Sequence, residues 1–132
     1  VNKIKFFDDR DSSFIGAIVP LLTPLKVSKF EVIFRKGNFP NSIFFITKGR
    51  VSFYLEKKQV TFKEMSEGGY FGDIDIIFRR ARKLSVIALE DSDFLTLSKK
   101  MFEEMIMQEF PDVYEEMYLV AYEREKRIKK SK

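Results

Sequence analysis

Between residues 25 and 97 the apolar residues gather in short segments that are separated by turn signals. The segments are rich in Val, Ile, Phe and Thr, and turn signals lie between them at residues 36–38, 40–41, 48–49, 56–58 and 67–69. Short segments at this spacing are typical of an antiparallel sandwich or barrel. The pattern predicts seven strands, over residues 25–30, 31–35, 42–47, 51–55, 60–65, 84–89 and 94–97.

Both ends of the chain carry a helical pattern instead. A cap signal over residues 11–13 predicts a short helix over residues 14–22, and Ser98 can cap a helix over residues 99–110 that ends before Pro111. A last helix follows, with one stripe made by Val113, Met117, Val120, Ala121, Arg124 and Ile128. Because strands are followed by helices without a linker or repeat, we expect residues 1–132 to form one α+β domain.

The composition removes most catalytic chemistry. The chain has no cysteine, histidine or tryptophan, while 15 Phe and 5 Tyr provide an aromatic core. Thiol nucleophiles, Ser-His triads and Cys or His metal sites are therefore excluded. No pair of carboxylates has a recognisable catalytic neighbourhood, so we expect neither an enzyme, nor a metal site, nor a bound cofactor.

The net charge of +4 is spread along the chain except for a basic stretch over residues 123–132. We interpret this stretch as the solvated end of a helix, because Lys and Arg suit the last turns of a helix dipole. No helix-turn-helix pattern is present, so we expect no nucleic-acid partner.

No apolar run approaches the length of a membrane span. The chain begins with Val1 rather than with an initiator methionine, so we expect it to be a piece of a longer protein.

The stretch from residue 70 to residue 86 carries the most specific chemistry. Gly72 lets the backbone approach a ligand, the amides of a short following helix can donate to an anion, and Arg82 can add a charge-assisted pair. The alternative is a strand end followed by a solvated basic loop. We favour a phosphate site because the stretch connects two strands and places several cations beside a turn rich in amides.

Several motifs together resemble the cyclic-nucleotide-binding domain family, and most of all its channel branch. Residues 46–51 resemble the family's F-I-x-x-G-x-V hairpin, and residues 35–37 its R-x-G turn. Residues 70–73 resemble Y-F-G-E, residues 82–86 align with R-T-A-S-V, and residues 110–111 and 121–124 resemble the last helix. The branch comprises cyclic-nucleotide-gated, hyperpolarisation-activated and ether-à-go-go-type channels.

The resemblance implies both a fold and a set of binding residues. The fold is an antiparallel jelly-roll sandwich with a short N-terminal helix, a short phosphate-cassette helix and two C-terminal helices. The phosphate would contact Gly72, Ile74, Arg82 and Lys83, and the ribose would contact Asp73. The positions that match the purine pocket are Phe53, Met65, Arg124 and Ile128.

Three residues depart from the family pattern. Asp73 is one methylene shorter than the usual Glu, and Lys83 replaces a threonine that supports cGMP in channels, which favours cAMP. Asp75 replaces a small residue beside the phosphate. A like charge at about 4 Å costs roughly 4 kcal/mol at intermediate dielectric, although Arg79 or Arg80 could offset it.

The resemblance therefore implies a regulatory domain of a cation (potassium) channel that couples cAMP or cGMP binding to movement of the last helix and to gating. Its partners would be the channel linker and pore in the same chain, within a homotetramer, and its place would be the cytoplasmic side of a membrane protein. Two alternatives stay open. One is a degenerate homologue that binds no nucleotide and serves as an interaction or coupling module, and the other is the regulatory domain of a cyclic-nucleotide-dependent kinase.

Overall fold

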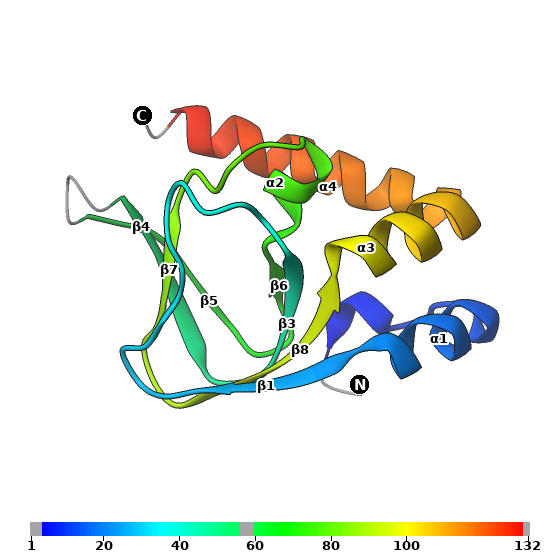
Figure 1. The fold of residues 1–132 in the computed structure, drawn as a ribbon, viewed down its shortest axis with the longest axis horizontal. Coiled ribbons are helices and arrows are strands. Elements are labelled where there is room, and N and C mark those ends of the chain that lie inside the picture. Colours follow the sequence, from blue (N-terminus) through cyan, green and yellow to red (C-terminus); the bar gives the residue numbers. More distant parts are fainter. Residues whose placement is uncertain (1–3, 56–59, 131–132) are drawn as a thin grey trace.

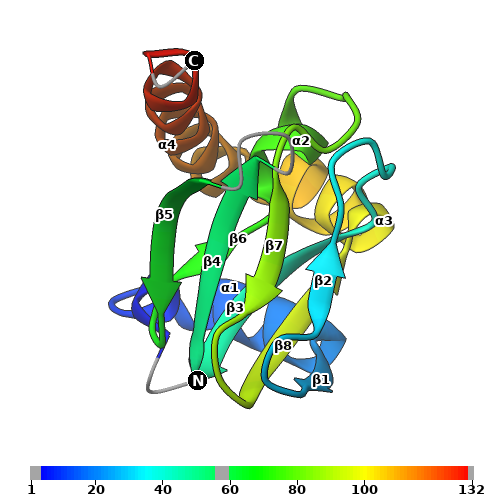
Figure 2. The same ribbon diagram turned by 90° about the vertical axis from the view of Figure 1, so that its left-hand side faces the viewer.

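The computed structural model describes residues 4–55 and 60–130, which form two four-stranded antiparallel sheets with helices along one side (Figure 1). The first sheet has the order β1-β8-β3-β6 and the second the order β2-β7-β4-β5. The strands of the first sheet are β1 (Thr23–Val27), β3 (Ser42–Lys48), β6 (Tyr70–Phe71) and β8 (Ser92–Ser98). Those of the second, which faces the viewer in Figure 2, are β2 (Val32–Phe34), β4 (Arg50–Leu55), β5 (Val60–Ser66) and β7 (Ser85–Ala88). The predicted jelly-roll sandwich is confirmed.

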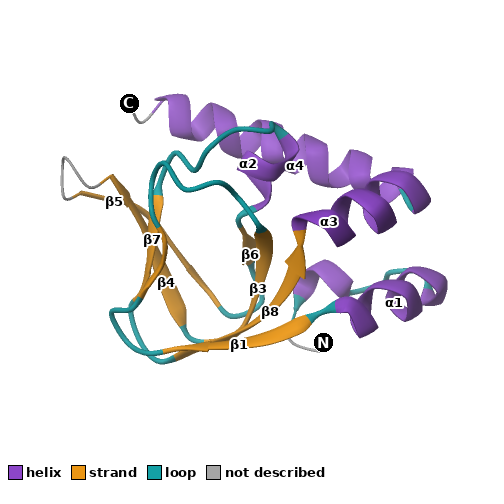
Figure 3. Cartoon of the chain, in the orientation of Figure 1, coloured by secondary structure: helices purple, strands orange, loops and turns teal. Residues whose placement is uncertain are grey.

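The helices pack mainly against the first sheet, as Figure 3 shows. At the N-terminus a short 3₁₀ turn (Lys5–Phe7) is followed by α1 (Ser12–Ile18) and a second 3₁₀ turn (Val19–Leu21). The cassette helix α2 spans Asp73–Ile77, and α3 (Lys99–Met101) continues into a π-helical segment (Phe102–Met107). The last helix, α4 (Pro111–Lys130), crosses over α2. Among the described residues, no helix has the length and apolar composition that crossing a membrane requires.

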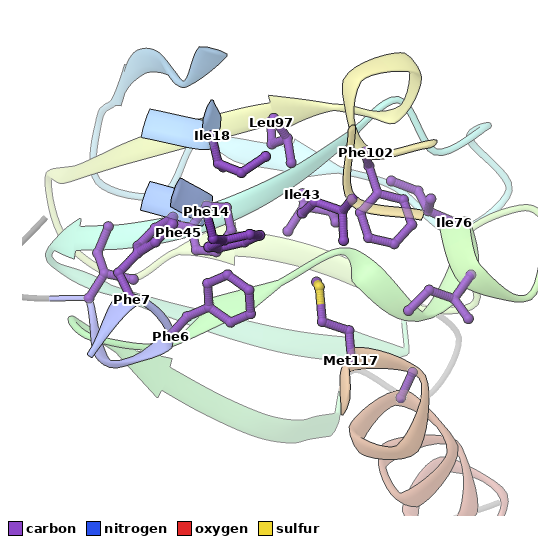
Figure 4. Packing of buried hydrophobic residues seen from close by; sticks show 14 residues of the cluster. Phe6, Phe7, Phe14, Ile18, Ile43, Phe45, Ile76, Leu97, Phe102 and Met117 are labelled. Atoms are coloured by element: carbon purple, nitrogen blue, oxygen red, sulfur yellow. The ribbon is translucent and has the colours of Figure 1, made fainter. Parts of the chain in front are cut away.

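Strand β3 explains why the fold has two cores, because it is buried on both faces. Ile43 and Phe45 point to one side and Phe44 and Ile46 to the other, as expected for the two-residue period of a strand. The second pair packs inside the sandwich with β4, β7 and β8 residues. The first pair packs against the helices in a cluster that Figure 4 shows, with Phe6, Phe7, Phe14, Ile18, Ile76, Leu97, Phe102 and Met117.

Several element boundaries differ from the prediction. The strand expected over residues 25–30 is β1, which ends at Val27 because residues 28–31 form a turn in which Phe30 has a φ of 70°. The helix expected over residues 14–22 ends at Ile18, since Pro20 lies in the following 3₁₀ turn. The two-residue strand β6 was not predicted.

The C-terminal helices follow the predicted pattern more closely. Ser98 caps α3, where its hydroxyl accepts a hydrogen bond of 3.1 Å from the Met101 amide. The expected regular helix over residues 99–110 instead widens into the π-helical segment. On α4, Met117, Ala121 and Ile128 are buried as expected, but Val120 is 41% exposed and does not belong to the packed stripe.

Candidate functional site

A cavity of about 320 Å³ lies between strands β4 and β5, the cassette that begins at Gly72, and helix α4. This volume is at the lower end of the range of about 300–1,000 Å³ that is common for ligand pockets. One part of the wall is apolar and is made by Phe34, Phe53, Phe62, Met65, Phe71, Leu84 and Ile128. The remaining wall consists of Gly72, Ile74 and the charged residues Lys63, Asp73, Asp75, Lys83, Arg124 and Arg127. A ligand with one flat apolar part and one anionic part would match this lining.

The cassette turns sharply at Gly72, which connects β6 to α2. Gly72 has a φ of 88°, a conformation that side chains rarely allow. A Cβ atom there would lie 3.0 Å from the Ser42 carbonyl oxygen and 3.2 Å from the Phe44 ring. Glycine therefore permits both the turn and the close contact of the cassette with β3.

Arg82 lies behind the cassette and is 2% exposed. Its Nη1 donates to the Gly72 carbonyl oxygen at 2.8 Å, and its Nη2 donates to the Ser42 carbonyl oxygen at 2.9 Å. The guanidinium also stacks 4.0 Å from the centre of the Phe34 ring. Burial lowers the pKa of Arg82 to about 10, although the nearby carboxylates oppose this shift. Arg82 therefore holds the cassette to β3 in this structure and does not line the cavity.

The charge of Asp75 is offset mainly by Arg80, one of the two arginines that the sequence suggested. The Arg80 Nε donates to Asp75 Oδ1 at 2.8 Å, and Arg82 Nη1 lies 3.7 Å from Asp75 Oδ2. Arg80 also binds Glu125 of α4 through both of its terminal nitrogens, with Nη2 at 2.8 Å from Oε1. Arg80 thus neutralises the Asp75 carboxylate and connects α4 to the cassette.

Of the two carboxylate oxygens of Asp73, one accepts a hydrogen bond and the other has no hydrogen-bond partner among the described residues. Its side chain is 1% exposed, and Oδ1 accepts a hydrogen bond of 3.0 Å from Arg124 Nη1. The other oxygen, Oδ2, is buried and has no hydrogen-bond partner among the described residues. A buried acceptor without a partner costs about 1–3 kcal/mol, so a donor that entered the cavity would relieve this cost.

The buried carboxylate of Asp73 predicts a pH dependence of stability. Burial raises its pKa above the ordinary 3.8, and the Arg124 charge opposes that rise only in part. The folded state therefore holds this proton more tightly than the unfolded state, and the contribution of Asp73 to stability decreases as pH rises through the raised pKa. The Asp73→Asn variant lacks this titrating group. We therefore expect the difference in unfolding free energy, variant minus parent, to become more positive as pH rises from about 4 to about 7. Urea unfolding at a series of pH values measures this difference, and parallel curves for the two proteins would contradict it.

Eight of the nine residues that the sequence suggested line the cavity: Phe53, Met65, Gly72, Asp73, Ile74, Lys83, Arg124 and Ile128. Arg82 is the ninth and lies outside the wall. Their roles in binding stay predictions. Sequence reasoning did not single out Lys63 and Arg127, two further cations of the wall. The two-residue alternation with Met65 could have indicated Lys63.

Residues 24–109 match the family model described as "Cyclic nucleotide-binding domain". The human potassium/sodium hyperpolarization-activated cyclic nucleotide-gated channel 2 is 33% identical over 133 residues, which cover 98% of this chain and 14% of that protein. The alpha subunit of the rod photoreceptor cyclic nucleotide-gated channel of Gallus gallus is 26% identical over 118 residues, which cover 85% of this chain and 18% of that protein. The chain thus spans less than a fifth of the length of these channels.

Two solved structures show the same fold. The cAMP-bound form of the EAL enzyme Bd1971 matches with a TM-score of 0.67 and 28% identity, over 83% of this chain and 30% of that chain. A cAMP-bound PfPKA-R structure matches with a TM-score of 0.83 over 96% of this chain and 43% of that chain, and at 16% identity it supports the fold alone. With the family model matching residues 24–109 and the jelly-roll topology in agreement, this chain belongs to the cyclic nucleotide-binding domain family.

Proposed function

We propose that the cavity binds a cyclic nucleotide, cAMP or cGMP, and that the chain is a regulatory ligand-binding domain without catalytic activity of its own. One observation carries this proposal: Asp73 Oδ2 is a buried carboxylate oxygen without a partner among the described residues, and it belongs to a residue of the cavity wall. A ribose hydroxyl is a donor of suitable size for this oxygen. Asp73 would then accept two hydrogen bonds, one from the ligand and one from Arg124.

The other cavity residues would hold the two ends of the ligand. The phosphate would lie against Gly72 and Ile74 at the start of α2, where Lys83 adds a positive charge, and Arg82 would strengthen this field from behind. The purine would contact Phe53, Met65, Arg124 and Ile128 in the more apolar part of the wall. We therefore retain all nine predicted residues, with Arg82 both supporting the cassette and attracting the phosphate.

Helix α4 would couple binding to regulation, because it provides Arg124, Arg127 and Ile128 to the wall. A ligand that contacts these residues only when α4 is docked shifts the population toward the docked arrangement. Since the related proteins include cyclic nucleotide-gated channels, we propose that the longer protein is a cation channel that conducts potassium.

In that setting the domain would lie on the cytoplasmic side, within a homotetramer, and α4 movement would act on a linker and pore in the same chain.

A second candidate function is that of a coupling module that binds no nucleotide. Two contacts favour it: the Arg82 guanidinium is engaged by two backbone carbonyls, and the chain's own Arg80–Glu125 pair docks α4 on the cassette.

A thermal titration distinguishes these two candidates. If the 132-residue chain binds cAMP or cGMP, a hundredfold excess over the dissociation constant stabilises the folded state by about 2.7 kcal/mol. For a domain of this size the thermal midpoint should then rise by roughly 10 °C. The noncyclic 5′-monophosphates serve as matched ligands and should give a smaller rise. An unchanged midpoint at millimolar concentrations of both cyclic nucleotides would support the coupling module instead.

A further inference from the structure

Lys63, which the sequence analysis did not single out, lies in the part of the cavity that would hold the purine, together with Phe53 and Met65. On the paired strands its Cα partner is Phe53, and residues that are paired in this way share one face of the sheet. The register shifts beside this pair, so that Tyr54 is paired with Thr61 and Phe62 is the extra residue of a β-bulge. A bulge can direct neighbouring side chains to the same side, and both Phe62 and Lys63 line the cavity.

The charged groups around Lys63 are mostly donors. Arg124 and Arg127 of α4 line the same cavity, and neither guanidinium can accept a hydrogen bond. Burial lowers the pKa of Lys63, and the charges of Arg124 and Arg127 lower it further, whereas Asp73 acts in the opposite direction. No hydrogen bond or ion pair in the described parts of the chain engages the Lys63 ammonium. Lys63 is therefore a crowded cation that would gain from an acceptor.

The carboxylates of the wall are engaged by arginines rather than by Lys63. Asp73 and Asp75 both belong to the cassette helix, where Asp73 binds Arg124 and Asp75 binds Arg80. Purines differ in what they present to such a wall: guanine carries two adjacent acceptors, O6 and N7, whereas adenine carries N7 and a donor amino group. Lysine and arginine pair well with the guanine edge and leave the adenine amino group without an acceptor.

We infer that Lys63 makes this cavity selective for cyclic nucleotides with a 6-oxopurine base, so that cGMP is preferred to cAMP. The inference rests on the proposed function and revises the preference for cAMP that the replacement of threonine by Lys83 suggested. That replacement concerns the phosphate end, whereas Lys63 acts on the edge of the base. The O6 atom would accept from the Lys63 ammonium, and the acceptor would reduce the repulsion among the three cations.

Calorimetric titration of the 132-residue chain with cGMP, cyclic IMP and cAMP tests this selectivity. Cyclic IMP carries O6 and N7 but lacks the 2-amino group of guanine, so it isolates the contribution of the oxo edge. We expect cGMP and cyclic IMP to bind about tenfold more tightly than cAMP, within the discrimination that one good base contact provides. In Lys63→Met we expect affinity for both oxopurines to fall about tenfold while that for cAMP stays the same or rises. Lys63→Gln, which keeps a donor without the charge, should retain part of the preference.

Lys26→Met is the matched control, because Lys26 also lies on a strand but is exposed and outside the cavity. It should leave all three affinities unchanged. Equal binding of the three nucleotides, tightest binding of cAMP, or an equal loss for all three in Lys63→Met would each overturn the inference. Tight cGMP but weak cyclic IMP would assign selectivity to the 2-amino group and would overturn it as well. Absence of binding by all three would instead refute the proposed function, and the inference with it.

Discussion

Arg82→Ala is expected to lower the unfolding free energy by roughly 4 kcal/mol, whether or not a nucleotide binds. The substitution leaves the Gly72 and Ser42 carbonyl oxygens without the donors that Arg82 provides. Each buried polar group that loses its partner costs about 1–3 kcal/mol. The stacking on Phe34 is lost in addition. Urea unfolding of the parent and the variant measures this cost as a shift in midpoint at constant slope.

Two further variants show whether the loss arises from these contacts. Arg82→Lys keeps the charge but has no planar fork, so it cannot reproduce both hydrogen bonds and should give an intermediate loss. Arg79→Ala removes an exposed arginine three residues away and should change stability by less than about 0.5 kcal/mol. A loss below about 1 kcal/mol for Arg82→Ala would show that the two carbonyls find other partners.

This structural role changes how a binding defect at Arg82 is interpreted. In the sequence, Arg82 suggests only an anion partner, because side-chain patterns carry no information about backbone carbonyls as acceptors. In the structure those carbonyls connect the cassette to β3 through Arg82. Loss of nucleotide binding in Arg82→Ala would therefore follow from a displaced cassette as well as from a missing phosphate contact. Arg82→Lys separates the two, since it keeps the charge near the phosphate while weakening the support.

The predictable part of the fold rests on periodicity and on turn residues. The strands β3 and β4 have strong patterns, and their predicted bounds agree with the structure to within one residue, while α4 spans the whole predicted stripe from Val113 to Ile128. The strand β6 has only two residues, which is too short for any period to appear. The π-helical turn also has no sequence signature, because its apolar residues Phe102 and Ile106 fit a regular helix equally well.

The candidate site likewise contains residues that the local sequence predicts and residues that it does not. Residues close to Gly72 in sequence could be predicted because the cassette is one continuous stretch. Phe62 needed knowledge of the β-bulge, because strict alternation would place it on the face opposite to Lys63 and Met65. The partners Arg80 and Glu125 are 45 residues apart, and only the docking of α4 on the cassette brings them together. Contacts of this kind depend on tertiary packing and cannot be read from local pattern.

Glu125→Lys is expected to release α4 from the cassette. Glu125 is 8% exposed and binds Arg80 through both carboxylate oxygens, with the Lys83 ammonium 3.6 Å from Oε2. A lysine at this position would be repelled by Arg80 and Lys83, the two cations that Glu125 attracts. Breaking a buried ion pair costs about 3–5 kcal/mol, and the partial exposure of Arg80 reduces this to roughly 2–3 kcal/mol. Hydrogen-exchange protection over residues 121–129 should therefore fall by roughly a hundredfold.

Glu123→Lys is the matched control, since it makes the same charge change two residues earlier on the same helix. Glu123 is exposed and pairs only weakly with Lys126 at 3.8 Å, so protection should change by less than about threefold. Equal protection in both variants would show that the Arg80–Glu125 pair does not hold α4.

The pKa of Glu125 adds an independent test of the same contact. The hydrogen bond from Arg80 lowers it below its usual value, and the charges of Arg80 and Lys83 act in the same direction. A carboxylate with a depressed pKa contributes stability that is lost as pH falls through that pKa. Protection of α4 in the parent should therefore decrease as the solution becomes acidic, whereas the contribution of Asp73 to stability increases there.

Because α4 forms part of the cavity wall, Glu125→Lys should also weaken nucleotide affinity in proportion to the lost docking energy. An unchanged affinity would show that nucleotide binding does not depend on the docking of α4.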